Sequence, residues 1–318
     1  MLAATQPRRL LIRSNDSLMR IDAPPRLPAA MAAMAEAIDR QFDQCLALPE
    51  DQRARLYAAM RHSAIGGGKR LRPLLVQASC DLFNVSFESA VRTGLAVECI
   101  HVYSLIHDDL PAMDNDDLRR GKPTTHRAFD EATAILAGDC LHDLAYSILV
   151  DERTHPDPFA RCELVKALAA ASGPGGMAGG QMMDLIAETM AFDLATVTRM
   201  QQLKTGALIL FCVEAGAILA RVPEDKRVGL RGYAHDLGLA FQIADDLLDV
   251  EGDAETTGKA VGKDAVAGKA TFVSLMGPAQ ARAQAEMLVA QAKDHLHGFG
   301  SEAALLREIA DFAIARKH

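Results

Sequence analysis

Residues Asp193–Ala220 read DLATVTRMQQLKTGALILFCVEAGAILA and decide the fold class of this chain. Apolar side chains occupy most faces of this stretch when it is wound as a helix. A helix that is apolar nearly all round lies buried inside a large bundle. Its most apolar part, Gly206–Ala220, is shorter than the roughly 20 residues that a membrane-spanning helix needs, so we expect no membrane span.

Similar helical patterns extend along the rest of the chain. Aromatic residues make up only 5% of the 318 residues and Trp is absent, a bias that favours helix over sheet. Runs of β-branched residues are scarce, and no segment alternates with a period of two. The sequence therefore predicts an all-α fold, with helices over Ala29–Leu48, Glu50–Ile65, Pro73–Phe83, Phe87–Asp109, Thr125–Val150, Phe159–Ala171, Gly179–Glu188, Asp193–Ala220, Asp225–Val250, Pro278–Leu296 and Ser301–Arg316.

No repeat, low-complexity block or Pro/Ser-rich linker divides the chain. A length prior of roughly 150 residues per domain allows two domains, but a single large helical domain fits equally well. We expect one domain over residues 29–318, preceded by a flexible N-terminal extension over residues 1–28. The arginines of this extension resemble those of an organelle-targeting peptide, but we prefer to interpret it as a frayed terminus.

The formal net charge is −8, which argues against a nucleic-acid-binding protein. An acidic protein still binds an anionic substrate where cations gather at the site. The cysteines show no CxxC spacing and lie in apolar helical patterns, so we expect buried free thiols and a cytoplasmic, reducing location. They are Cys45, Cys80, Cys99, Cys140, Cys162 and Cys212.

A first cluster of carboxylates follows an apolar helix in the segment SLIHDDLPAMDNDDLRRG, Ser104–Gly121. Like charges this close repel one another, which favours either exposure to solvent or a bound cation. Carboxylate oxygens at this density suit Mg²⁺, although a solvated helix end is the alternative. Pro111 should open the helix and let Asp114 return toward Asp108. A calcium loop starting at Asp114 is excluded because Leu118 occupies a ligand position.

A second cluster lies in FQIADDLLD, Phe241–Asp249. Asp245 and Asp249 are four residues apart and share one face of the helix, next to Asp246. Carboxylates in such apolar surroundings are costly to bury without a counter-charge. The two clusters therefore predict opposing acidic walls around a cavity that holds metal ions.

Basic residues accompany both clusters. The turn GGGKRLRP, Gly66–Pro73, does not match a P-loop, but its glycines and its cations Lys69 and Arg72 could cradle a phosphate; a polar interhelical turn is the alternative. Arg119 and Arg120 directly follow the first cluster. The remaining candidates are Lys204-Thr205, Lys259, Lys263, Lys269, and His101 on the same helical face as Asp108.

Taken together, these motifs resemble those of the trans-isoprenyl diphosphate synthase (polyprenyl synthetase) family, most closely its bacterial-type farnesyl diphosphate synthases. Their order along the chain matches that of the family. They are GGKRLRP (Gly67–Pro73), ECIH (Glu98–His101), DDLPAMD (Asp108–Asp114), GGQMMD (Gly179–Asp184), KTG (Lys204–Gly206), DDLLD (Asp245–Asp249) and GK (Gly268–Lys269). Val273 departs from a proline that is common in the family.

The resemblance implies an antiparallel helix bundle around a deep central cavity, usually in a homodimer. It implies Mg²⁺-dependent head-to-tail condensation of isopentenyl diphosphate with dimethylallyl or geranyl diphosphate, which gives farnesyl diphosphate and diphosphate. A geranylgeranyl or geranyl diphosphate synthase is the nearest alternative, and a non-catalytic partner subunit is a remote one. A terpene cyclase fits less well because the second motif is DDxxD, and an unrelated Mg²⁺-dependent phosphohydrolase also stays open.

The resemblance also implies a role for each matching residue. Three Mg²⁺ ions, or Mn²⁺ in their place, would be held by Asp108, Asp109, Asp114, Asp245 and Asp249. The catalytic set adds Lys204, Thr205 and Asp246. Isopentenyl diphosphate would bind at Gly68, Lys69, Arg72, His101 and Arg120. The allylic diphosphate would bind at Arg119, Lys204, Thr205, Gln242, Lys259 and Lys269. The floor that limits product length would be Tyr103 with Ser104.

Overall fold

Helices account for nearly all regular structure in residues 26–251 and 270–315, which the computed structural model describes. The N-terminal half contains α1 (Leu27–Cys45), α2 (Ala54–Ala64), α3 (Leu71–Asp81), α4 (Phe87–Asp108), α5 (Thr125–Ala128), α6 (Glu131–Val150) and α7 (Pro158–Ser172). The C-terminal half contains α8 (Met177–Ala187), α9 (Leu194–Gln201), the π-turn η1 (Gln202–Gly206), α10 (Ala207–Leu219), η2 (Glu224–Lys226), α11 (Val228–Glu251), α14 (Phe272–Met276), α15 (Pro278–Asp294), η3 (Ser301–Ala303) and α16 (Ala304–Ala315). The all-α prediction is confirmed.

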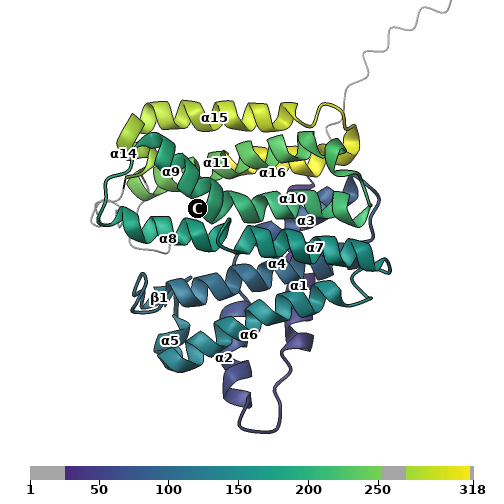
Figure 1. Cartoon of the computed structure of the whole chain (residues 1–318), viewed down its shortest axis with the longest axis vertical. Coiled ribbons are helices and arrows are strands. Elements are labelled where there is room, and N and C mark those ends of the chain that lie inside the picture. The colour runs from purple at the N-terminus through teal and green to yellow at the C-terminus, as the bar shows by residue number, and fades with distance from the viewer. Residues whose placement is uncertain (1–25, 252–269, 316–318) are drawn as a thin grey trace, which may run out of the picture.

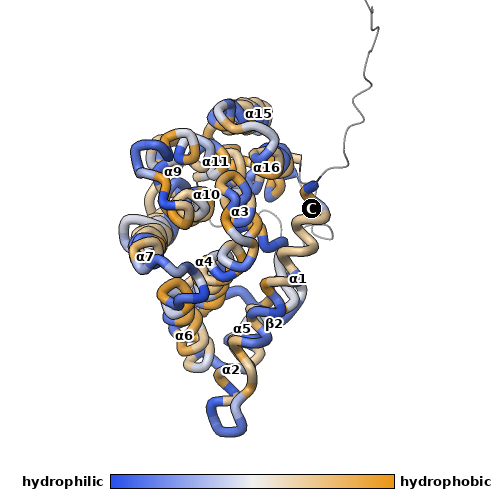
Figure 2. Tube along the Cα trace, turned by 90° about the vertical axis from the view of Figure 1, so that its right-hand side faces the viewer, coloured by the Kyte–Doolittle hydropathy of each residue, from blue (hydrophilic) through white to orange (hydrophobic). Residues whose placement is uncertain are grey.

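The core lies where α3, α4 and α10 meet (Figure 1). α4 packs against α3 and α6, while α10 packs against α3, α7 and α11. α11 is covered on its outer side by α15, and the view along the bundle places these helices in successive layers (Figure 2). Since α4 and α10 are buried along most of their length, the residues at their ends are held in fixed positions.

Helix ends in this bundle are set by specific caps. Ser86 begins α4 by accepting a hydrogen bond from the amide of Ser89 at 3.1 Å. Asp130 begins α6 in the same way with Thr133, at 2.7 Å. These caps define where α4 and α6 start, and thus which of their residues reach the interior.

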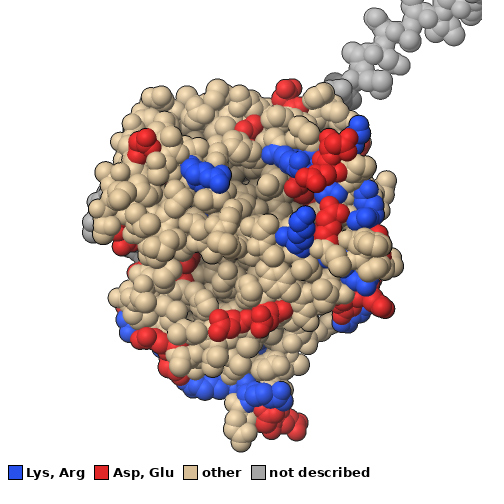
Figure 3. Space-filling view, in the orientation of Figure 1, with Lys and Arg blue, Asp and Glu red and all other residues tan. Residues whose placement is uncertain are grey.

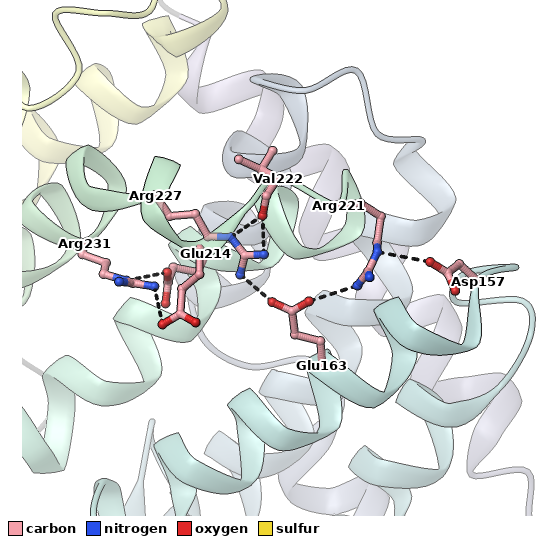
Figure 4. Close-up of polar contacts among 8 residues, drawn as sticks. Asp157, Glu163, Glu214, Arg221, Val222, Arg227 and Arg231 are labelled. Atoms are coloured by element: carbon pink, nitrogen blue, oxygen red, sulfur yellow. Dashed lines mark hydrogen bonds and ion pairs between the residues drawn. The ribbon is translucent and has the colours of Figure 1, made fainter.

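Ion pairs fix the turn between α10 and α11 against α7 (Figure 4). Glu163 of α7 accepts from Arg221 at 3.0 Å and from Arg227 at 2.7 Å. Arg231 of α11 pairs with Glu214 of α10 at 2.8 Å. This network holds α11, which carries the second aspartate motif, in register with α10, which directly follows the KTG motif in η1.

The structure differs from the sequence prediction in several elements. Thr125–Val150 is two helices, because Asp130 has an extended backbone and caps α6. A two-stranded hairpin, β1 (Leu118–Arg119) with β2 (Lys122–Pro123), follows the first aspartate cluster. The short helix α14 was not predicted. α1 starts at Leu27, two residues before the expected boundary, and residues 1–25 lie outside the described residues.

The expectation that all six thiols are buried is wrong. Cys80, Cys99 and Cys212 are buried in the core, whereas Cys140 is partly exposed and Cys45 and Cys162 are exposed, because these three lie on outward faces of their helices. All six are free thiols, as expected.

Two helices are long and apolar enough to cross a membrane by length and composition alone. They are Glu131–Val150 and the continuous run Leu194–Leu219, which extends the Gly206–Ala220 stretch that the sequence analysis judged too short. In the most apolar windows of these helices, 44% and 56% of the residues are buried inside the bundle. Core helices pass the same test, so this is weak evidence for a span.

Candidate active site

The first aspartate cluster lies where α4 ends. The helix stops at Asp108, and the amide of Asp114 donates to the Asp108 carbonyl at 2.8 Å. The chain therefore turns back around Pro111, as the sequence predicts. Asp114 is exposed, while Asp109 is buried.

A cavity of about 440 Å³ opens beside the end of α4. Its lining comes from α3, α4, α8 and η1, and it combines charged groups with apolar ones. The lining includes Arg72, His101, Tyr103, Ser104, Asp108, Met177, Gln181, Met182, Leu185, Lys204 and Thr205. Five predicted site residues and the predicted floor pair, Tyr103 and Ser104, thus line one chamber, although they come from distant parts of the chain.

The Asp108 carboxyl is in an unusual electrostatic environment. Burial raises its pKa to about 6, Lys204 opposes the shift, and Asp114 adds to it. The charged form of Asp108 is therefore less favourable than that of an exposed carboxyl, and a nearby cation would stabilise it. This is the condition that makes a carboxylate a good partner for a metal ion.

Asp109 is engaged differently from Asp108. Its two carboxylate oxygens accept hydrogen bonds from Nε of Arg119 at 2.7 and 2.9 Å. Burial raises the pKa of Asp109, and the hydrogen bond to Arg119 opposes that shift. The pair fixes Arg119 beside the first cluster and leaves Asp108 as the carboxylate that faces the cavity.

The basic turn brings several predicted cations together. A Cβ on Gly68 would lie 2.7 Å from Nη2 of Arg120, so only glycine lets the guanidinium lie against the turn. Nε of Arg72 is buried and makes no hydrogen bond. Burial and the neighbouring Arg72 and Arg120 hold the pKa of His101 well below its usual value, so this imidazole is neutral. The unpartnered Arg72 Nε suits an incoming anion.

Lys69 lies apart from this group. Its Nζ is 5.5 Å from the ring centroid of Phe312 in α16, and Lys69 is not among the residues that line the cavity. Its predicted contact with isopentenyl diphosphate stays a prediction.

Two hydrogen bonds connect the cavity wall to Asp246 of the second aspartate motif. Thr205 donates to Oε1 of Gln242 at 3.3 Å, and Gln242 donates to Asp246 at 3.0 Å. Asp246 is buried and also accepts from the amide of Phe272 at 2.9 Å. Asp246 thus orients Gln242 and anchors α14, instead of facing the cavity.

Asp245 and Asp249 are half-buried and do not line the described cavity. Their predicted opposition to the first motif stays a prediction. Lys259, Lys263 and Lys269 lie outside the described residues.

Two residues of the motif Gly179–Asp184 were given no role by the sequence analysis. Asp184 accepts from Nζ of Lys204 at 2.7 Å and holds that lysine at the cavity edge. Gln181 lines the cavity, and its side-chain oxygen and nitrogen are both buried without a partner. The spacing of the motif placed both residues on α8, but nothing in the sequence paired Asp184 with Lys204.

The described side chains do not form a group of three or more His, Cys, Asp or Glu residues arranged to hold a metal. This fits Mg²⁺, which usually binds through one or two carboxylates and completes its shell with substrate phosphates and water. The Asp108 side chain is half-buried and makes no hydrogen bond within the described residues.

Comparisons with known proteins decide the family. The sequence profile of the polyprenyl synthetase family matches residues 53–300. The chain belongs to this family. Prenyl diphosphate synthases generally depend on a divalent metal, in agreement with the acidic motifs.

Relatives of the family resemble the chain over most of its length. It is 43% identical over 301 residues to the farnesyl diphosphate synthase of Escherichia coli K12, covering 93% of this chain and 99% of that protein. It is 42% identical over 295 residues to a dimethylallyltranstransferase of Fischerella ambigua, covering 92% and 84%. A crystal structure of an FPP/GFPP synthase from Zymomonas mobilis is 58% identical, with a TM-score of 0.84 and coverage of 91% and 99%. The fold is the isoprenoid synthase fold.

Proposed function

We propose that this protein is a Mg²⁺-dependent prenyltransferase that joins isopentenyl diphosphate head to tail with dimethylallyl or geranyl diphosphate. The products are farnesyl diphosphate and diphosphate. The observation that carries this proposal is the cavity in which Arg72, His101, Asp108 and Lys204 meet above an apolar lining. Family membership and the names of the relatives support it.

The charged end of the cavity suits the departing diphosphate. Arg119 and Lys204 are held in place by Asp109 and Asp184, so they are preorganised for an anion. Breaking the allylic C–O bond moves an electron pair onto the diphosphate, and fixed cations stabilise that charge without rearranging. Arg119, Lys204, Thr205, Gln242, Lys259 and Lys269 are the proposed binding set for the allylic diphosphate.

We assign the metal ions to the two aspartate motifs. Asp108, Asp109 and Asp114 on one side and Asp245 and Asp249 on the other would hold Mg²⁺, three ions per site, or Mn²⁺ in its place. When bound, the ions supply Lewis-acid stabilisation of the diphosphate charge.

The apolar lining serves the carbon–carbon step. Met177 and Leu185 keep water from the allylic cation until the alkene of isopentenyl diphosphate attacks it. The side-chain oxygens of Thr205 and Gln242 can stabilise the cation. One C–C bond forms as the C–O bond breaks, and the released diphosphate takes the final proton, so we assign no general base to the protein.

The proposal is tested by incubating the purified protein with isopentenyl and geranyl diphosphates and measuring product chain length. With Mg²⁺ we expect farnesyl diphosphate. Chelation with EDTA should abolish turnover, and excess Mg²⁺ should restore it, because without a divalent cation the carboxylates of the acidic motifs repel the diphosphate. Release of diphosphate without a longer prenyl product would instead indicate a phosphohydrolase.

Tyr103→Ala should lengthen the product by at least one five-carbon unit. The Tyr103 ring lies in the cavity wall against His142, with centroids 5.2 Å apart, so its removal deepens the chamber. Gas chromatography of the dephosphorylated products measures the change. The control Tyr146→Phe keeps its ring and loses only a hydrogen bond to Ser172. An unchanged product from Tyr103→Ala would show that another residue sets the floor.

A geranylgeranyl or geranyl diphosphate synthase shares every motif, and the Zymomonas mobilis relative is named for two products, so product analysis decides between them. A non-catalytic partner subunit would show no turnover in the same assay.

We further propose a homodimer in the cytoplasm. Large apolar side chains are exposed on α6, α7 and α8, where Figure 3 shows few charged residues over the middle of one face. They include Ile135, Leu136, Phe159 and Met182. Such a patch is typical of an interface between subunits. Sedimentation equilibrium should give twice the 34.2 kDa mass of one chain.

A further inference from the structure

Arg70, inside the basic turn, combines a left-handed backbone with a buried charge. Its φ is 48° and its ψ is 38°, although residues other than glycine rarely adopt this conformation. Gly66 and Gly68 in the same turn also have positive φ, and glycine would be the easier residue here. An arginine at this point therefore needs contacts that compensate for its conformation.

Those contacts come from three helices. Nη1 of Arg70 lies 2.8 Å from Oε1 of Glu98 in α4, and Nη2 lies 2.6 Å from Oδ1 of Asp39 in α1. Nη2 also donates to the carbonyl of Ala64 at the end of α2, and the guanidinium lies 5.6 Å from the ring centroid of Phe42. The Arg70 side chain is 1% exposed and that of Glu98 is 3% exposed. Arg70 thus connects α1, α2 and α4 and cannot itself reach a ligand in the cavity.

The same contacts hold both ends of the turn. The second oxygen of Asp39 accepts a hydrogen bond from the amide of Gly66 at 3.3 Å, so one carboxylate fixes Gly66 and Arg70 together. Arg72 follows two residues later and lines the cavity. Glu98 lies one helical turn before His101, which lines the same cavity. The guanidinium therefore links the two backbone segments that carry Arg72 and His101.

Glu98 also balances the positive charge at this end of the molecule. Burial lowers the pKa of Arg120, Glu98 opposes that shift, and Arg70, Arg119 and Arg72 add to it. Without the two carboxylates, these cations would repel one another around a turn that has little intrinsic stiffness.

We propose that Arg70, held by Asp39 and Glu98, is a positioning residue for isopentenyl diphosphate. It sets the distance between Arg72 and His101 without touching the substrate. The inference rests on the proposed function, because it names isopentenyl diphosphate as the ligand of that subsite.

The test uses the double variant Arg70→Met/Glu98→Leu, which replaces the buried pair with apolar side chains and leaves no unpaired buried charge between them. We expect the Kd for isopentenyl diphosphate, measured by titration calorimetry, to rise at least about tenfold. The KM for geranyl diphosphate should stay within about twofold, since that substrate binds on the other side of the cavity. Arg70→Lys keeps the charge but lacks the two guanidinium nitrogens that bind Asp39 and Glu98 separately, and should give a smaller rise.

Arg92→Lys is the matched control. Arg92, like Arg70, is a buried arginine, but it belongs to α4 and lies away from the cavity. It is bonded to Thr154 at 3.0 Å and to Asp151 at 3.3 Å. The Arg92→Lys variant should have a lower melting temperature, and its Kd for isopentenyl diphosphate and KM for geranyl diphosphate should be unchanged. An unchanged Kd in a folded Arg70 variant, or equal rises for both substrates, would overturn the proposal. The proposed function would fail separately: in that case the wild-type protein would form no prenyl product longer than its allylic substrate.

Discussion

Asp108→Asn is expected to lower kcat by about 10²–10³-fold while the protein stays folded. The substitution keeps the shape of the side chain and removes the one charge of the first motif that faces the cavity. Because burial already raises the pKa of Asp108 to about 6, loss of this charge should not weaken the fold. Steady-state turnover of geranyl with isopentenyl diphosphate measures the first effect, and thermal unfolding measures the second.

Asp139→Asn is the control for this prediction, since Asp139 is an exposed aspartate of α6 outside the cavity. Its kcat should equal that of the wild-type protein. If Asp108→Asn kept full turnover at saturating Mg²⁺, the assignment of the first motif to metal binding would have to be abandoned.

Gly180→Ala is expected to destabilise the protein by about 1–3 kcal/mol and to reduce turnover strongly. A Cβ at this position would lie 2.2 Å from the backbone nitrogen and 2.6 Å from Cα of Lys204, so α8 and η1 would have to separate. That movement would also disrupt the pair between Lys204 and Asp184. Urea unfolding and steady-state kinetics measure the two effects.

Gly175→Ala tests whether the effect comes from contact with Lys204 rather than from loss of any glycine. A Cβ on Gly175 would meet no atom within 4 Å. Its stability and turnover should be close to those of the wild-type protein. Equal stability of both variants would show that the crossing of α8 and η1 tolerates a methyl group.

Much of this arrangement was predictable from the sequence because it depends on local patterns. Apolar periodicity located nearly all of the long helices, and Pro111 indicated the turn that brings Asp114 back to Asp108. The match of several motifs in order identified the family, which the comparisons confirm.

The remaining features depend on contacts between segments that are distant in sequence. The ion pair of Lys204 with Asp184, the chain from Thr205 through Gln242 to Asp246, and the contacts of Arg70 require the packing of separate helices. Asp130 broke the predicted helix 125–150 because its capping bond competes with the helical ladder, an outcome that apolar spacing does not reveal.

The π-turn at Gln202–Gly206 limits how this enzyme can evolve. A π-turn is equivalent to one extra residue inserted into a regular helix, and here it lies where Lys204 and Thr205 turn toward the cavity. Winding the same residues as a regular helix would rotate all of α10 by about 100° relative to α9. The buried face of α10 would then leave its partners on α3 and α7. A substitution that abolished the π-turn would disturb the placement of Lys204 and Thr205 and the packing of α10 together, so this segment should tolerate fewer changes than a surface loop.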